Sequence, residues 1–286
     1  MSAISTDPAN ADQIAYWNGP GGANWVARQE AQDAQLAPVS AALLARAAVK
    51  ARERIVDVGC GAGATTEELG RLVGAGGHVL GIDVSAPMLE RARRRLKPDL
   101  PVEFVQGDAT TYAFERADVD LLFSRFGVMF FAEPARTFAN LRAALKPGGR
   151  LVFMCWRSPE ENDWVMVALR AAYAHVPPLP KVGPEDPGMF SFAREDRVRR
   201  VLGEAGFRSV ALEPFGMEID VGRGRGLDEA VANAAQIGPA SRTLEGAPPE
   251  TVAAVHAAIR QAYARRQRGS AVPLPAAMWL VTAQNP

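Results

Sequence analysis

The stretch RIVDVGCGAGATTEEL, residues 54–69, decides the fold that we expect for this chain. Its apolar start, Ile55 to Val58, is short and β-branched, which is typical of a buried strand, whereas the segment from Thr65 has the acidic first turn of a helix. Three glycines separate the two parts: Gly59, Gly61 and Gly63. Because glycine lacks a Cβ and a helix N-terminus offers unpaired N–H groups, such a turn brings backbone close to a ligand. The stretch therefore predicts a strand–turn–helix unit that holds a nucleotide-like molecule.

Further apolar runs alternate with helix-like segments along the chain. The runs that we expect to be strands are Val79–Ile82, Val102–Val105, Val119–Phe123, Leu151–Cys155, a stretch near Ser209–Glu213 and AAMWLVTAQ at 276–284. Between two of them, a helix begins at Ser85 as its N-cap and ends at Pro98, with its arginines facing solvent. This alternation predicts an α/β fold with a doubly wound, Rossmann-like sheet of about seven strands, mostly parallel with an antiparallel last strand, and helical cap segments.

The charge and cysteine content exclude several classes of protein. The 286 residues contain 32 Lys and Arg against 32 Asp and Glu, so no overall field attracts nucleic acid or an anionic membrane. Two cysteines, Cys60 and Cys155, cannot form a disulfide framework. The N-terminus has no signal-peptide pattern, and no run approaches ~20 apolar residues. We expect a cytoplasmic protein without a membrane span or nucleic-acid partner, either a monomer or a homodimer.

Over roughly residues 50–215, several motifs resemble those of the class I S-adenosylmethionine-dependent methyltransferases, particularly the bacterial small-molecule branch that includes quinone C-methyltransferase-like enzymes. The motifs are VDVGCGAG at 56–63, GIDVS at 81–85, QGDAT at 106–110, LLFSRFGVMFF at 121–131 and LKPGGRLVF at 145–153. The resemblance implies that Asp57 lies near the methionine end of the cofactor. It also implies that Asp108 accepts from the adenine amine and that Ala109 donates its backbone N–H.

Asp83, which ends the second predicted strand, is a candidate ribose ligand by its spacing from the glycine loop as well as by the resemblance. Asp83 lies 20 residues after Gly63, which suits a carboxylate that accepts both ribose hydroxyls. The further residues that we expect beside the cofactor are Val84, Met88, Ser124, Tyr16 and Trp25. The last two belong to AYWNGPGGANWVARQE at 15–30, which closes over the cofactor or else only packs on the domain surface.

The resemblance implies a division of the chain into cap, core and lid. Residues 1–50 form an N-terminal helical cap, and residues 51–222 with 273–286 form the cofactor-binding core. Helical insertions at 157–195 and 223–272 form a lid over the acceptor site, the second one including a helix from Glu250 to Arg268.

Two other functions remain open. GCGAGA also fits G-x-G-x-x-A, the fingerprint of an NAD(P)-dependent oxidoreductase, but that interpretation gives Asp57 no role. The Tyr-x-x-x-Lys pair of short-chain dehydrogenases is also missing. A non-catalytic ligand-binding protein on the same fold is the second alternative, because fold alone does not determine function.

Methyl transfer is an in-line displacement in which a general base is optional. The candidate catalytic residues are Arg125 and His175. Arg125 follows Ser124, and it either binds an anionic group or pairs with a glutamate such as Glu133. No metal is expected, because Asp118 and Asp120 lie at the start of their strand, away from the site.

The side chains available to wall an acceptor pocket are mostly aromatic. They are Trp164, Tyr173, Met189, Phe190, Phe192 and Trp279. Such a wall suits a small, largely apolar or aromatic acceptor, which S-adenosylmethionine methylates to leave S-adenosylhomocysteine.

Overall fold

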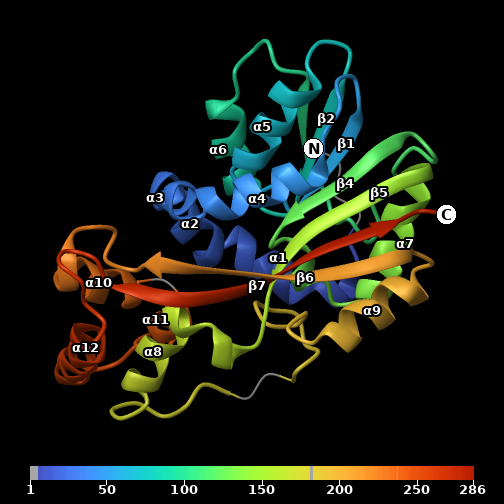
Figure 1. Cartoon of the computed structure of the whole chain (residues 1–286). Coiled ribbons are helices and arrows are strands. Elements are labelled where there is room, and N and C mark those ends of the chain that lie inside the picture. The colour runs from blue at the N-terminus through green and yellow to red at the C-terminus, as the bar shows by residue number, and fades with distance from the viewer. Residues whose placement is uncertain (1–5, 181–182, 237) are drawn as a thin grey trace. The chain divides into compact units, whose positions relative to one another are not determined.

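The computed structural model describes residues 6–180, 183–236 and 238–286, and its central feature is a seven-stranded sheet (Figure 1). The strands are β1 (Arg54–Val58), β2 (His78–Asp83), β3 (Val102–Gln106), β4 (Val119–Arg125), β5 (Leu145–Trp156), β6 (Arg208–Asp220) and β7 (Pro273–Gln284). Their order in the sheet is β3-β2-β1-β4-β5-β7-β6. The chain thus moves outward from β1 to β3 and returns to β4, so the order reverses between β1 and β4, where α/β sheets bind ligands.

The strands around this reversal are parallel. Ile55 of β1 lies opposite Val79 of β2 on one side and Leu121 of β4 on the other. β4 is also parallel to β5. Because parallel strands end at the same edge, the carboxyl ends of β1, β2 and β4 meet there. The prediction of a mostly parallel, doubly wound sheet of seven strands is confirmed.

The last strand runs against its neighbour, as the sequence predicts. The backbone N–H groups of Gly148 and Arg157, near the two ends of β5, donate to the carbonyls of Asn285 and Ala277. Residue numbers therefore rise along β5 as they fall along β7, which is the antiparallel arrangement. β6 is longer than the stretch expected near Ser209–Glu213.

The helices fall into three groups along the chain. The N-terminal group is η1 (Pro8–Asn10), α1 (Ala11–Asn18), α2 (Pro20–Ala27), α3 (Gln29–Gln35) and α4 (Ala37–Ala47). The helices between strands are α5 (Ala64–Val73), α6 (Ala86–Arg95), η2 (Val128–Phe130), α7 (Pro134–Ala144) and α9 (Glu195–Glu204). The remaining ones are η3 (Pro159–Glu161), α8 (Asp163–Ala172), α10 (Gly226–Ala234), α11 (Pro239–Arg242) and α12 (Pro249–Ala264). The expected extension of α12 to Arg268 is wrong, because Arg268 and Ala271 instead form an isolated antiparallel bridge.

The chain divides into two compact units. The first contains Met1–Trp156, Glu185–Glu213 and Trp279–Pro286, and the second contains Arg157–Pro184 and Pro214–Met278. Strands β6 and β7 contribute residues to both units. The N-terminal helices thus belong to the same unit as β1 to β5, and the predicted insertion 157–195 is shared between the units.

Phe192 explains why that segment is shared. Its side chain is 2% exposed, and its ring lies 6.1 Å from that of Phe138 and 6.3 Å from that of Phe153. These rings form the core between β5 and α7, where burying an aromatic side chain is strongly favourable. The expectation that Phe192 walls an acceptor pocket is therefore wrong, because it is a core residue of the first unit.

Candidate functional site

The glycine loop, residues 59–63, joins β1 to α5 at the carboxyl edge of the sheet. All three of its glycines have positive φ, at +66° for Gly59, +55° for Gly61 and +78° for Gly63. A Cβ at Gly59 would lie 2.6 Å from the Gly127 Cα, and one at Gly63 would lie 2.7 Å from the Phe104 ring. A Cβ at Gly61 would meet only the Met88 sulfur, at 3.7 Å. Two of the glycines are thus required by packing, whereas Gly61 leaves backbone accessible beside Met88.

Asp57 is the penultimate residue of β1, just before this loop, and is completely buried. Its Oδ2 accepts hydrogen bonds from the hydroxyls of Thr65, at 2.8 Å, and Thr66, at 2.7 Å. Its Oδ1 is buried without a hydrogen-bond partner among the residues that the structure describes. Burial raises the pKa of Asp57 to about 6, although the two threonine hydroxyls and the charge of Arg125 act to lower it. An unpaired buried carboxylate oxygen is costly, so a nearby cation would stabilise it.

Asp83 at the end of β2 is tied directly to the glycine loop. Its Oδ2 accepts from the Gly61 backbone N–H at 2.8 Å, and its Oδ1 accepts from the Ser85 backbone N–H at 2.8 Å. Burial raises the pKa of Asp83, against the lowering effect of the backbone N–H groups of Ser85, Gly61 and Val84. Each carboxylate oxygen retains acceptor capacity beyond these bonds. The structure thus brings Asp83, Gly61 and Met88 together at one place.

The N-terminal segment, residues 7–30, contacts the carboxyl ends of β2 and β3. Asp108 is buried, and its Oδ2 accepts from the Asp7 backbone N–H and from Asn10 Nδ2, both at 2.9 Å, while its Oδ1 accepts from the Thr110 N–H at 2.9 Å. The carboxylate predicted to meet adenine is therefore engaged largely with the N-terminal segment. The carbonyl of the neighbouring Ala109 accepts from the side chain of Asn140 at 2.9 Å.

The same segment caps α6. The Ser85 hydroxyl donates to the Trp17 carbonyl at 2.6 Å, and the Ala86 N–H donates to Asn18 Oδ1 at 3.0 Å. Ser85 is the N-cap residue of α6, as predicted, but its side chain makes no capping hydrogen bond, and Asn18 supplies that acceptor from a distant part of the chain. The carbonyl of Val84 also accepts from Asn18, at 2.9 Å.

Aromatic side chains of the N-terminal segment gather beside η2. The Trp17 ring lies 6.4 Å from that of Trp25 and 5.1 Å from that of Phe130. Tyr16 packs edge-on against Trp17 but is 45% exposed. Trp17 thus joins the segment to the sheet edge, whereas Tyr16 faces solvent.

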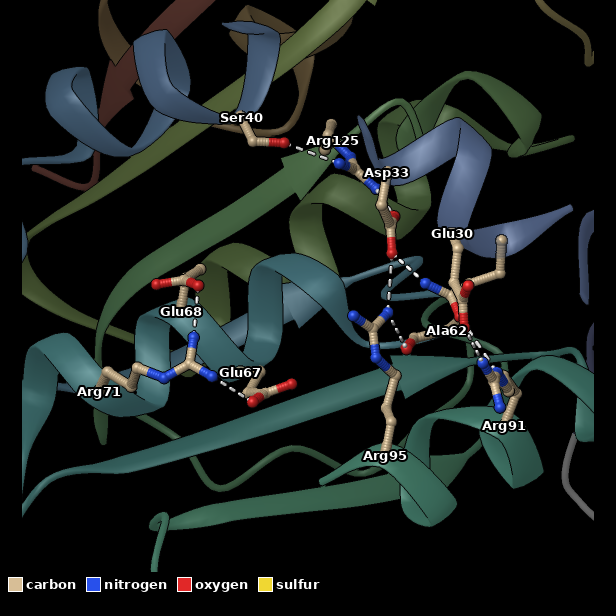
Figure 2. Close-up of polar contacts among 11 residues, drawn as sticks. Glu30, Asp33, Ser40, Ala62, Glu67, Glu68, Arg71, Arg91, Arg95 and Arg125 are labelled. Atoms are coloured by element: carbon tan, nitrogen blue, oxygen red, sulfur yellow. Dashed lines mark hydrogen bonds and ion pairs between the residues drawn. The ribbon is translucent and has the colours of Figure 1, made fainter. Parts of the chain in front are cut away.

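Asp33 of α3 joins two arginines from distant elements (Figure 2). Its Oδ2 lies 2.8 Å from Arg95 Nη1, and its Oδ1 lies 3.5 Å from Arg125 Nη2. Arg95 also donates to the carbonyl of Ala62 in the glycine loop at 3.3 Å, and Arg125 donates to the Ser40 hydroxyl at 2.7 Å. The acidic partner of Arg125 is therefore Asp33 rather than Glu133.

The arginines of α6 do not simply face solvent, which corrects a second expectation. Arg91 donates to the side chains of Gln29, at 3.0 Å, and Glu30, at 3.1 Å, and Arg93 donates to the Phe104 carbonyl at 2.8 Å. Arg94 of this run keeps a mostly exposed side chain, at 68%. The run fastens α3 to α6 because a guanidinium provides several donors in a fixed fork.

The end of β4 has an unusual backbone conformation. Ser124 is buried, and its hydroxyl donates to the Val58 carbonyl at 2.7 Å and accepts from the Gly127 N–H at 3.1 Å. Phe126 has a φ of +67°, and its ring stacks on that of Trp156 with centroids 4.3 Å apart and planes within 3°. A bulky residue in the left-handed region is strained, and such strain is concentrated at functional sites.

Three further residues considered from the sequence belong to other elements. His175 is exposed and belongs to the second unit, after α8. Asp118 and Asp120 lie at the start of β4, where they pair with Arg54 and Lys146. Within the described ranges, no group of three or more His, Cys, Asp or Glu side chains has the arrangement of a metal site.

Residues 55–149 match the family described as a methyltransferase domain. This part of the chain is a methyltransferase domain. Its relatives include a demethylmenaquinone methyltransferase of Clavibacter sepedonicus, 39% identical over 38% of this chain and 43% of that protein. Another demethylmenaquinone methyltransferase, from Staphylococcus saprophyticus, is 28% identical over 58% of this chain and 75% of that protein. The match therefore spans less than half of the Clavibacter relative.

Two solved structures have a fold similar to that of this chain. A Bacillus halodurans protein assigned provisionally to the methyltransferases has a TM-score of 0.57 at 20% identity, over 86% of this chain and 98% of that one. Phosphoethanolamine N-methyltransferase 2 of Haemonchus contortus, solved with S-adenosylmethionine, has a TM-score of 0.53 at 18% identity, over 87% of this chain and 52% of that one. In the described part of this chain, no helix is both long and apolar enough to cross a membrane.

Proposed function

We propose that this protein transfers a methyl group from S-adenosylmethionine to a small, largely apolar or aromatic acceptor and releases S-adenosylhomocysteine. The observation that carries the proposal is the hydrogen bond from the Gly61 N–H to Asp83 beside the unpaired buried oxygen of Asp57. This arrangement lies where the strand order reverses, which is the ligand position of doubly wound sheets.

The residues around the glycine loop fit this cofactor. S-adenosylmethionine supplies a methyl group made electrophilic by its sulfonium charge. Asp57 and Asp83 are both buried, and carboxylates in a site of low dielectric favour a cation over a polyphosphate. The remaining acceptor capacity of Asp83 suits the two ribose hydroxyls, and the contact surface of Met88 beside Gly61 suits the adenine ring.

The protein's own task in this reaction is positioning. An in-line displacement requires the acceptor atom ~3–3.5 Å from the methyl carbon, with water excluded. The N-terminal segment, held by Asp108 and Ser85, covers the carboxyl ends of β2 and β3 and thereby restricts water there. No general base is needed for an amine, thiol or carbanion-like acceptor.

An aromatic acceptor is supported by the stacked pair Phe126 and Trp156 near the carboxyl ends of β4 and β5. Planar rings favour offset stacking with other planar rings. The names of the two demethylmenaquinone methyltransferase relatives agree with such an acceptor. Arg125, whose side chain is 10% exposed, orients an anionic group of the cofactor or acceptor.

The proposal is tested by measuring how much S-adenosylhomocysteine forms from S-adenosylmethionine in the presence of each member of a panel of phenols, quinols, amines and small heterocycles. We expect turnover with at least one aromatic acceptor, impaired in Arg125→Ala. As a control, Arg94→Ala removes an exposed guanidinium that pairs with Glu90 on the same helix and should leave turnover unchanged. Methylation of RNA or protein with all small acceptors inert would overturn the acceptor class. Tighter binding of NAD than of S-adenosylmethionine would favour an oxidoreductase instead.

A further inference from the structure

The contact of Asp33 with two guanidinium groups has an electrostatic consequence for the cofactor. Asp33 is 18% exposed, and its two arginine partners, Arg95 and Arg125, are 27% and 10% exposed. All three side chains are thus mostly buried. Charges in a buried environment interact more strongly than charges at the surface. Arg95 also touches the carbonyl of Ala62, so the cluster borders the glycine loop itself.

The charges of this cluster act on the residues of the proposed cofactor site. The charge of Arg125 lowers the pKa of Asp57, while that of Asp83 raises it. Burial lowers the pKa of Arg125, the charges of Asp33 and Asp57 act against that lowering, and the charge of Arg95 adds to it. These five side chains therefore form one interacting set with one negative charge in excess when all are ionised. Without Asp33, the set would be neutral, and two arginines would face the loop without an acidic partner on α3.

S-adenosylmethionine and S-adenosylhomocysteine differ in charge by one unit, because the sulfonium becomes a neutral thioether. We infer that Asp33 is a positioning residue that makes the site favour the sulfonium cofactor over its neutral product by compensating Arg95 and Arg125. This inference rests on the proposed function. It assigns to α3 a role in product release, since a site that prefers the cation binds the product less tightly.

A purely structural role of Asp33 would have a different signature. If Asp33 only fastened α3, its loss would loosen the segment and weaken both ligands to a similar extent. Loss of a compensating charge instead weakens the cation selectively, because a neutral thioether has little Coulomb interaction with the arginines. The ratio of the two dissociation constants therefore separates the two roles.

The experiment is calorimetric titration of S-adenosylmethionine and S-adenosylhomocysteine into the wild type and Asp33→Asn at neutral pH. We expect Asp33→Asn to shift the ratio of the two dissociation constants about tenfold toward the product, as for a unit charge acting through a partly screened site. Glu30→Gln is the matched control, because Glu30 lies on the same helix and pairs with Arg91 but is 85% exposed. This control should leave the ratio unchanged.

Two further variants keep the test decisive. Arg95→Gln retains Asp33 and removes one positive charge, so the ratio should move the other way, toward S-adenosylmethionine, even if Asp33→Asn is too unstable to measure. The double variant Asp33→Asn/Arg95→Gln restores the charge balance and should return the ratio to the wild-type value. An unchanged ratio in Asp33→Asn or Arg95→Gln, with both ligands still bound, overturns the inference. Failure of the wild type to bind either ligand contradicts the proposed function instead.

Discussion

The backbone N–H of Gly61 donates to Asp83 Oδ2 at 2.8 Å, so the centre of the glycine loop is fixed to the end of β2. Gly61 follows β1 and Asp83 ends β2, and these two neighbouring strands are parallel, so their carboxyl ends meet at one edge. A ligand that contacts the loop backbone therefore also meets the carboxylate. The position of the loop depends on this bond as well as on its glycines.

The first prediction separates the roles of the glycines. Gly61→Ala places a methyl group 3.7 Å from the Met88 sulfur, in open space beside the loop, at a φ of +55°. We expect a cost of about 1–2 kcal/mol in the free energy of unfolding from the left-handed backbone, together with loss of cofactor affinity. Thermal denaturation and calorimetry measure the two effects.

Gly74→Ala is the matched control for this strain. Gly74 has a φ of +62°, and a Cβ there meets nothing within 4 Å. Its stability loss should be at least as large, because its ψ of −172° lies in a region that is essentially restricted to glycine, but cofactor affinity should stay at the wild-type value. Equal affinities of Gly61→Ala and Gly74→Ala would show that Gly61 does not face the cofactor.

The second prediction concerns Asp57 and pH. Its pKa rises from 3.8 to about 6 on folding, so the native state holds its proton at pH values where the unfolded state has lost it. The contribution of this group to stability is therefore greatest at low pH and declines as pH rises from about 4 to about 6, by up to about 3 kcal/mol. Denaturant unfolding of the wild type and Asp57→Asn across this window measures the difference between them, which should disappear below it.

A cation bound beside Asp57 should reverse this cost. S-adenosylmethionine stabilises the ionised form, so its affinity should rise between pH 5 and pH 7 with release of a proton, as expected when a ligand favours deprotonation. Calorimetry in two buffers of different ionisation enthalpy detects that proton. An identical pH profile in Asp57→Asn would assign the effect to another group.

The third prediction concerns the N-terminal segment. The side-chain amide of Asn10 donates to Asp108 at 2.9 Å and to Thr110 at 3.1 Å, and its Oδ1 accepts from the Ala132 N–H at 2.9 Å. Asn10→Ala removes all three hydrogen bonds, although Asp108 keeps its bond from the Asp7 N–H and Thr110 keeps its bond to Thr137, so we expect a total cost of about 1–3 kcal/mol. We expect faster hydrogen exchange in the segment and weaker cofactor binding.

Asp12→Asn serves as its control, because Asp12 is an exposed residue of the same segment. That variant should retain the wild-type exchange rates and affinity. Deletion of residues 1–30 extends the test, and we expect a folded protein with little cofactor affinity. Normal binding by the truncated protein would rule out a covering role.

Much of the fold was predictable from the sequence because it depends on local patterns. Short β-branched runs and the glycine loop identify the first five strands, and the spacing from Gly63 to Asp83 identifies a candidate ribose ligand. β6 extends past Pro214 to Asp220, although proline and glycine in this stretch are unfavourable strand residues. As an edge strand of the sheet, β6 tolerates them.

The contacts that connect distant segments were not predictable. Asp33 lies in QEAQDAQ, a polar stretch typical of an exposed helix, and only the tertiary fold brings it to Arg125, 92 residues away. Likewise, nothing local shows that the backbone of Asp7 reaches Asp108. Thr65 and Thr66 were the one available signal for the surroundings of Asp57, since hydroxyls in the first turn after a glycine loop face the preceding strand end.

The central claim is that the glycine loop and Asp83 bind S-adenosylmethionine, and calorimetry on the wild type, Asp83→Ala and Asp120→Ala tests it most directly. Asp120 is the matched control, because it also accepts from a backbone N–H, that of Arg54 at 2.9 Å, but at the opposite end of the sheet. We predict saturable binding to the wild type, a loss of about 1.5–3 kcal/mol in Asp83→Ala and wild-type affinity in Asp120→Ala. Undiminished affinity in Asp83→Ala, or no binding of S-adenosylmethionine to the wild type, would contradict the account.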